Sequence, residues 1–115
     1  MNINFEMAIA NNIDVKDITL ISYLSFVSEK ENLGEEFEFP YSRIINDLPI
    51  IFNNKSYEAN TVKLRRMLDK EGMKKFIGKK VLKKGREFGT VILFKLNKEN
   101  IEALNVKGIV KWQRG

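Results

Sequence analysis

The chain folds around one segment, residues 56–96, whose sequence is SYEANTVKLRRMLDKEGMKKFIGKKVLKKGREFGTVILFKL. Ser56 suits a helix N-cap, and Gly72 is the kind of residue that follows a helix C-terminus. Between them, apolar side chains cluster on one side of a helical wheel. This pattern predicts a helix from Tyr57 to about Lys70. Its apolar cluster comprises Tyr57, Leu64, Met67 and Leu68.

Two extended runs, residues 74–84 and 89–96, follow the predicted helix and contain β-branched and aromatic residues. The residues between them form a glycine-rich turn, so the pattern predicts a β-hairpin. The hairpin is strongly basic, because no acidic residue occurs between Gly72 and Arg86. Its seven cations are Lys74, Lys75, Lys79, Lys80, Lys83, Lys84 and Arg86.

Residues that precede this segment predict a further set of elements. Asp14 can cap a helix over about 15–31, which has apolar residues at helical spacing. Residues 35–39 alternate polar and apolar side chains, as a short strand does. Pro40 suits the first position of a short helix over 41–48, since its missing N–H is not needed there.

The two ends of the chain carry weaker patterns. Residues 1–13 are expected to form an N-terminal arm or strand. Asn97 can cap a short helix over 98–104, and residues 105–115 form a C-terminal tail. The predicted domain therefore spans residues 14–104.

Charge is unevenly distributed along the chain, whose formal net charge is +5. Residues 1–54 hold nine acidic and three basic residues, whereas residues 55–86 hold twelve basic and three acidic ones. Such an asymmetry favours a face that binds a polyanion. A well-solvated lysine-rich surface would have the same composition.

The chain has no cysteine and no histidine, which excludes thiolate catalysis, histidine general-base catalysis and the usual zinc sites. It also has no Walker-type phosphate loop and no nucleophile elbow. We therefore expect no catalytic residue, no metal, no cofactor and no enzymatic activity. No secretory signal pattern opens the chain, and its apolar runs are too short to span a membrane. We expect a cytoplasmic protein without a membrane partner.

In chain order the predicted elements are helix, short strand, helix, helix and hairpin, which is the order of the winged helix-turn-helix. The expected fold is α+β, with a three-helix core, a basic β-hairpin wing and a short C-terminal helix. Residues 60–73, the hairpin 76–96 and the helix start Phe39-Pro40-Tyr41-Ser42 are the motifs that carry a resemblance. Over residues 14–97 the chain resembles the winged-helix module of plasmid and phage replication initiators and replisome organisers. It departs from that family at residues 49–55, where a longer apolar connection without glycine replaces a tight turn.

The resemblance and the charge together predict a duplex DNA-binding protein, either a transcription regulator or a replication or partition factor of a phage or plasmid. The helix over 57–70 would enter the major groove, and the hairpin would lie on the phosphate backbone. Asn60 and Arg66 are the expected base contacts, and Lys55 and Lys63 the expected phosphate contacts. The candidate site comprises Lys55, Tyr57, Asn60, Thr61, Lys63, Arg65, Arg66, Lys79, Lys80, Lys83, Lys84 and Arg86.

Other uses of the same elements stay open. A winged helix can also serve as a protein-interaction module, for example in a small phage protein that inhibits a host nucleic-acid enzyme. The acidic first half is a candidate surface for such a partner or for a homodimer. Hairpin lysines can also protect a strand edge from aggregation, although this accounts for two or three lysines rather than seven. Single-stranded nucleic acid is less favoured, because the hairpin offers only Phe76 and Phe88 for stacking.

Overall fold

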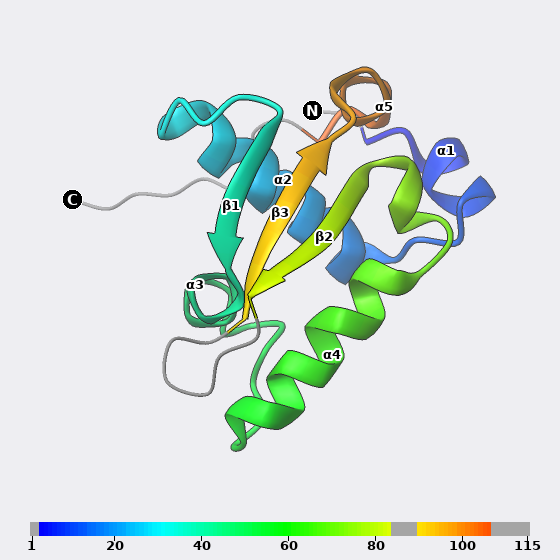
Figure 1. Cartoon of the computed structure of the whole chain (residues 1–115). Coiled ribbons are helices and arrows are strands. Elements are labelled where there is room, and N and C mark those ends of the chain that lie inside the picture. Colours follow the sequence, from blue (N-terminus) through cyan, green and yellow to red (C-terminus); the bar gives the residue numbers. More distant parts are fainter. Residues whose placement is uncertain (1–2, 84–89, 107–115) are drawn as a thin grey trace.

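The computed structural model describes residues 3–83 and 90–106, which form an α+β fold (Figure 1). Helices and a three-stranded antiparallel sheet make up this part of the chain, and they confirm the predicted α+β class. The elements are α1 (Phe5–Ala10), α2 (Val15–Lys30), β1 (Glu36–Pro40), α3 (Tyr41–Asp47), α4 (Tyr57–Asp69), the 3₁₀ helix η1 (Met73–Lys75), β2 (Ile77–Lys83), β3 (Val91–Leu96) and α5 (Lys98–Leu104).

The sheet has the strand order β1-β3-β2, so β1 pairs with the last strand rather than with its neighbour in sequence. Phe37 of β1 lies opposite Phe94 of β3, and Ile77 of β2 lies opposite Leu96. Because side chains alternate along a strand, these four residues all point to one face, where they are buried. Figure 1 shows α2 behind the sheet, so the sheet and α2 form two layers.

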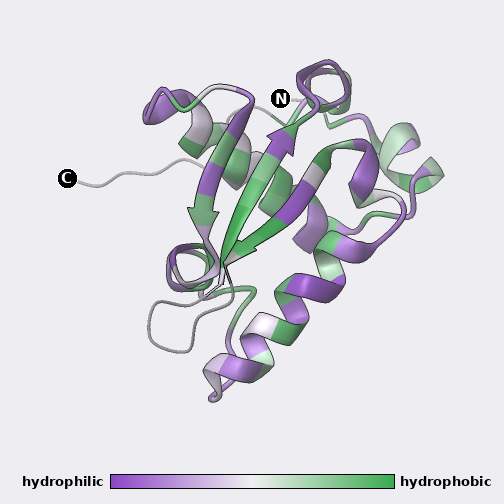
Figure 2. Cartoon of the chain, in the orientation of Figure 1, coloured by the Kyte–Doolittle hydropathy of each residue, from purple (hydrophilic) through white to green (hydrophobic). Residues whose placement is uncertain are grey.

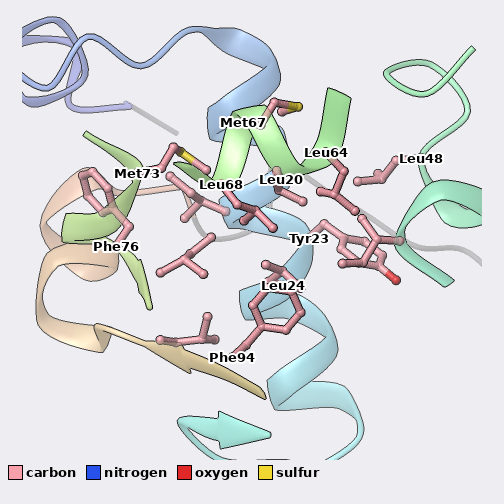
Figure 3. Packing of buried hydrophobic residues seen from close by; sticks show 14 of the residues in the cluster. Leu20, Tyr23, Leu24, Leu48, Leu64, Met67, Leu68, Met73, Phe76 and Phe94 are labelled. Carbon is pink, nitrogen blue, oxygen red and sulfur yellow. The ribbon is translucent and has the colours of Figure 1, made fainter. Parts of the chain in front are cut away.

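The core lies between α2, α4 and the inner face of the sheet (Figure 3). Tyr23 and Leu24 of α2, Leu64 and Leu68 of α4, and Phe94 of β3 have almost no exposed surface. Figure 2 shows that β3 is largely hydrophobic, whereas α4 is mostly hydrophilic with a few hydrophobic positions. Consequently α4 packs on the core along one side only and presents the rest of its surface to solvent.

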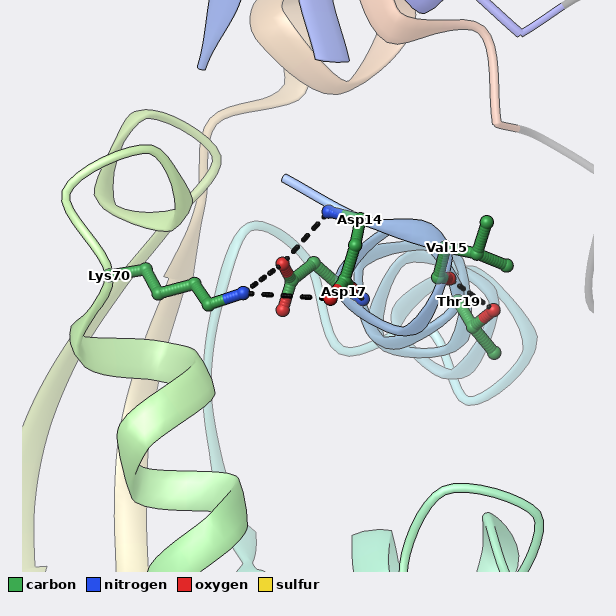
Figure 4. A network of polar contacts seen from close by, with 5 residues as sticks. All are labelled: Asp14, Val15, Asp17, Thr19 and Lys70. Atoms are coloured by element: carbon green, nitrogen blue, oxygen red, sulfur yellow. Dashed lines mark hydrogen bonds and ion pairs between the residues drawn. The ribbon is translucent and has the colours of Figure 1, made fainter. Parts of the chain in front are cut away.

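A polar junction joins the start of α2 to the end of α4 (Figure 4). Asp14 and Asp17 form a capping box, in which each carboxylate accepts the backbone N–H of the other residue. Lys70, just after α4, places its Nζ 2.7 Å from Oδ2 of Asp17 and 3.8 Å from Oδ2 of Asp14. The Asp17 side chain is 1% exposed, so this ion pair is largely shielded from water on the carboxylate side.

The protonation equilibria of the junction reflect this burial. Desolvation raises the pKa of the Asp17 carboxyl, and the hydrogen bond from Lys70 opposes that shift. The same hydrogen bond raises the pKa of the Lys70 ammonium. Oδ1 of Asp17 is buried and accepts no hydrogen bond from a described residue. Lys70 is therefore the cation that makes an ionised Asp17 tolerable in this position.

Most of the predicted elements are confirmed. The helix expected at about 15–31 is α2, the strand expected at 35–39 is β1, and the helix expected at 57–70 is α4. The helices expected at 41–48 and 98–104 are α3 and α5. Asn97 caps α5 as predicted, since its side chain accepts the Asn100 N–H.

The N-terminal expectation was wrong in its secondary structure, because a helix, α1, occupies part of residues 1–13. The Asn4 side chain caps α1 by accepting the Met7 N–H, and the Asn4 N–H donates to the Leu104 carbonyl at the end of α5. Six residues are too few to show a helical period in sequence. Packing of Ala8 into the core and the bond to α5 stabilise this helix instead.

Three boundaries also differ from the prediction. Pro40 is the last residue of β1 and the N-cap of α3, not its first helical residue. Residues 73–75 form η1, so β2 begins at Ile77 and not at Lys74. The end of α4 is at Asp69, with Lys70 as the C-cap in an extended conformation.

Gly72 is required for a different reason from the one the sequence suggested. Its φ of −64° lies in the right-handed region, so it does not serve as a left-handed cap. A Cβ atom on Gly72 would lie 1.8 Å from the Asn11 carbonyl oxygen. Glycine at this position lets the turn after α4 pack directly against the backbone that follows α1.

We expect Gly72→Ala to destabilise the fold by about 2 kcal/mol or more, because backbone at both sides of the contact must move. Chemical denaturation would measure the loss. Gly78→Ala is the matched control, since a Cβ there meets Lys95 at an ordinary 3.7 Å. Equal stability of the two variants would contradict the close approach at Gly72.

Lys70→Met should destabilise the protein by about 2 kcal/mol at pH 7, less than for a fully buried pair because Lys70 is partly exposed. Without Lys70, the pKa of Asp17 should rise further. A carboxyl with a raised folded-state pKa favours the fold at low pH, and this advantage disappears as the pH rises through that pKa. The loss in Lys70→Met should therefore shrink as the pH falls toward 3.8, the ordinary pKa of Asp17.

Denaturation of both proteins across pH 3.5–8 tests this dependence. Lys74→Met is the control, because among the described residues Lys74 pairs with the exposed Glu71 alone and its loss should cost under about 0.5 kcal/mol at any pH. A penalty for Lys70→Met that stays constant with pH would rule out the buried carboxylate as its cause.

Candidate nucleic-acid interface

The candidate interface is built on α4, which begins at a well-defined cap. The Ser56 hydroxyl accepts the Ala59 N–H at 3.3 Å, as the sequence predicted. Leu64, Met67 and Leu68 hold the inner side of the helix on the core. The outer side of α4 divides into two flanks and a central ridge, which differ in charge.

The flank of α4 that faces β2 carries Arg65 and Asp69, one helical turn apart. Nζ of Lys79, in β2, lies 2.7 Å from Oδ1 of Asp69, and this ion pair links the flank to the sheet. Lys79 lowers the pKa of the Asp69 carboxyl chiefly through this hydrogen bond. On the same side, burial raises the pKa of Tyr41 to about 12, and the nearby charge of Asp69 adds to the shift. No carboxylate of a described residue lies within 4 Å of the exposed Arg65 guanidinium.

The opposite flank of α4 faces α2. Lys63 donates from Nζ to the Ile51 carbonyl at 2.7 Å, so part of its hydrogen-bonding capacity braces the connection between α3 and α4. Partial burial lowers the pKa of Lys63, and the positive charge of Lys16 at the start of α2 lowers it further. This flank therefore holds two cations, Lys16 and Lys63. Arg66 is exposed four residues after Val62, on the ridge of the helix rather than on this flank.

Lys16 was missed by the sequence analysis. It is one of three basic residues in an otherwise acidic half of the chain, and nothing in its local pattern connects it with α4. The contact depends on how α2 packs against α4, which the Asp17–Lys70 ion pair fixes.

The ridge between the two flanks is close to neutral. Val62 is half-buried and Glu58 is exposed in the first turn, where a carboxylate also stabilises the helix dipole. Thr61, four residues before Arg65 and on the same flank, donates its hydroxyl to the Tyr57 carbonyl at 3.0 Å and so bonds within its own helix. Lys55 and Tyr57 lie exposed at the start of α4, and the Tyr57 side chain is 46% exposed.

The structure corrects the assignment of Asn60 as a base contact. Asn60 is 6% exposed, and its amide donates to the Asn54 carbonyl and accepts the Asn54 N–H. Both ends of the amide are therefore occupied in holding the turn before α4. The predicted apolar face was rotated slightly, because it included the exposed Tyr57 and left out Asn60.

Lysines of β2 are not all brought to α4. Lys79 shares the inner side of the sheet with Phe94 and reaches Asp69, whereas Lys80 lies on the outer side, opposite Leu93. Lys80 therefore does not join the α4 flanks, contrary to the prediction that groups it with them. Lys83 is the last residue of β2, while Lys84 and Arg86 lie outside the described residues.

Two acidic residues of the first half pair with a cation of the same half. Arg43 of α3 pairs with both carboxylate oxygens of Glu31, and its Nε lies 3.8 Å from Asp47. Asp47 also accepts the Tyr23 hydroxyl at 2.7 Å, and the Arg43 guanidinium lies 4.7 Å from the Phe39 ring centre. These contacts fasten α3 to α2 and β1, so the two carboxylates are not free to meet a basic partner.

Two other kinds of site are absent from the described residues. No group of three or more acidic side chains there is placed to hold a metal ion. Within the same residues, no helix has the length and apolar character needed to cross a membrane. No protein-family model, curated protein sequence or solved structure matches the chain.

Asn60→Ala should lower the free energy of unfolding by about 1–3 kcal/mol, because it leaves the Asn54 backbone groups without partners. Asn53→Ala, at an exposed position of the same connection, is the matched control and should change stability by under about 0.5 kcal/mol. Thermal unfolding distinguishes the two. A fully stable Asn60→Ala protein would show that the amide does not brace the turn.

Proposed function

We propose that the protein is a winged-helix protein that binds duplex DNA, with α4 in the major groove. The element order α2-β1-α3-α4-β2-β3 and the strand order β1-β3-β2 are compatible with a winged helix. The β2–β3 hairpin would then be the wing. The proposal depends on the charge pattern around α4 more than on the topology, because a fold alone does not determine a function.

The observation that carries the proposal is the placement of cations on both flanks of α4. The major groove is about 12 Å wide, so a helix lying in it has base edges in front and a phosphate backbone on each side. Lys16 and Lys63 lie on one flank, and Arg65 lies on the other. A helix with basic flanks and a nearly neutral ridge matches that environment better than a uniformly basic surface does.

Each flank would contact one phosphate backbone. Arg65 would hold one strand, with Lys79 available once phosphate competes with Asp69 for its ammonium. Lys16 and Lys63 would hold the other strand. Glu58, Val62 and Arg66 would face the base edges, where Glu58 can accept from a cytosine amino group, Val62 can contact a thymine methyl group and Arg66 can donate to guanine. Lys83, Lys84 and Arg86 of the hairpin remain the proposed backbone clamp.

In this proposal the protein acts in transcription regulation, replication or partition of a phage or plasmid and needs neither a cofactor nor a catalytic residue. The second candidate is a winged-helix module that binds a protein. It is favoured by Ile50, which is 81% exposed in the connection before α4 and close in sequence to the exposed Tyr57. A protein partner would use the exposed Ile50 and Tyr57, whereas DNA would use the two flanks.

Fluorescence anisotropy with duplex DNA at several salt concentrations tests the proposal. Binding should weaken steeply with salt, because each phosphate contact releases a counterion. Lys16→Gln and Arg65→Gln should each lower the affinity roughly threefold and reduce the slope of log K against log salt by about 1. Lys98→Gln, at an exposed lysine of α5, is the control and should bind as the unaltered protein does.

The two flank variants separate the candidates. Loss of affinity in Arg65→Gln alone would contradict the two-flank arrangement, because only one side of α4 would then touch DNA. If the DNA proposal is right, Ile50→Ser should bind DNA as the unaltered protein does, and both flank variants should lose affinity. No measurable binding to any duplex at low salt would overturn it.

A further inference from the structure

The outer face of the sheet is a surface that the α4 interface does not involve. In Figure 1 the sheet lies in front of α2, and no described helix covers its middle from the other side. The residues on this face come from alternate positions of the three strands. They are Glu36, Glu38 and Pro40 of β1, Val91, Leu93 and Lys95 of β3, and Gly78 and Lys80 of β2.

One cross-strand row on this face has an ordered charge sequence. Glu38, Leu93 and Lys80 lie side by side, since Glu38 and Lys80 are both register partners of Leu93. Glu38 and Lys80 are therefore about 10 Å apart across two strand spacings, too far to pair with each other. Neither has an ion pair with a described residue. The row places a negative charge, an apolar side chain and a positive charge in line.

Such a row is complementary to itself under a two-fold rotation. When two sheets face each other about an axis along β3, β1 of one copy lies over β2 of the other. Glu38 then meets Lys80 of the second copy, Lys80 meets Glu38 of the second copy, and the two Leu93 side chains meet at the axis. We propose that a second copy of this chain docks on the outer face of the sheet in this face-to-face arrangement.

The neighbouring rows differ in how well they suit the same axis. In the row Glu36–Lys95–Gly78, the two Lys95 side chains come near each other at the axis, and this like-charge contact opposes association. Glu36 of the second copy lies over Gly78, where no side chain occupies the space, and so flanks Lys95. On the other side of Leu93, Val91 is half-buried and adds apolar surface at the axis.

The size of the face indicates a weak dimer. Three strands about 4.8 Å apart and five residues long at about 3.3 Å each give a surface of roughly 15 by 17 Å. This is well below the roughly 800 Å² per partner of a standard stable interface. Association should therefore depend strongly on the two Glu38–Lys80 pairs and weaken with salt.

A charge exchange tests the arrangement. Sedimentation equilibrium of the full chain should show a reversible dimer at high protein concentration. Glu38→Lys and Lys80→Glu should each weaken dimerisation about tenfold or more, because each puts like charges opposite each other twice. The double variant Glu38→Lys/Lys80→Glu should restore the dimer to within about threefold of the original, since the pairs re-form with reversed sign. Glu99→Lys, on α5, is the control and should leave the dimer unchanged.

A chain that stays monomeric at millimolar concentration, or a dimer that survives both single reversals, would overturn the proposal. Circular dichroism of each variant verifies its folding. If a reversal prevents folding, Leu93→Cys provides a second readout, because the chain has no cysteine of its own. Because facing sheets lie about 10 Å apart, beyond the reach of a disulfide, a short bis-maleimide should then cross-link Leu93→Cys but not Glu99→Cys, and equal cross-linking of the two would also overturn it. DNA plays no part in these measurements, so their outcome does not depend on the proposed function.

Discussion

The ion pair between Asp17 and Lys70 is the contact on which the arrangement of the helices depends. It joins the first turn of α2 to the residue that ends α4, and the capping box with Asp14 makes the same carboxylate part of the start of α2. An ionised carboxylate at a buried position is stable only while a cation lies beside it. The pair therefore favours the one arrangement of α2 and α4 that keeps Lys70 next to Asp17. Gly72 acts two residues later, where it allows the chain to pass directly against Asn11.

This geometry decides which cations are free to bind something else. Lys70 is used at the junction, Lys79 is held by Asp69, and Lys63 is partly engaged with the Ile51 carbonyl. The exposed side chains of Lys16, Arg65 and Arg66 remain around α4. The high lysine content of the second half therefore overstates the charge available at α4, and the positions of the free cations carry more information than their number.

Pairing of β1 with β3 has a comparable effect on the sheet. It brings glutamates of the acidic half and lysines of the basic half to opposite edges of one outer face. Glu31 and Asp47, from the same acidic half, instead pair with Arg43 at the surface between α2 and α3. The acidic half is thus divided between ion pairs that fasten α3 to α2 and a sheet face that carries Glu36 and Glu38.

The sequence by itself determined the elements that depend on local chemistry. Helical and alternating periods placed α2, β1, α4 and α5, and the caps Asp14, Ser56 and Asn97 located the starts of three helices. Tertiary structure decided what depends on contacts between distant residues. It formed α1 against α5, turned Asn60 inward to hold Asn54, and separated Lys79 from Lys80 on the two faces of the sheet. It also brought Lys16 to α4. A pattern along the chain specifies only which side of its own helix or strand a side chain lies on. The neighbours of that side chain in other elements depend on how the helices and strands pack.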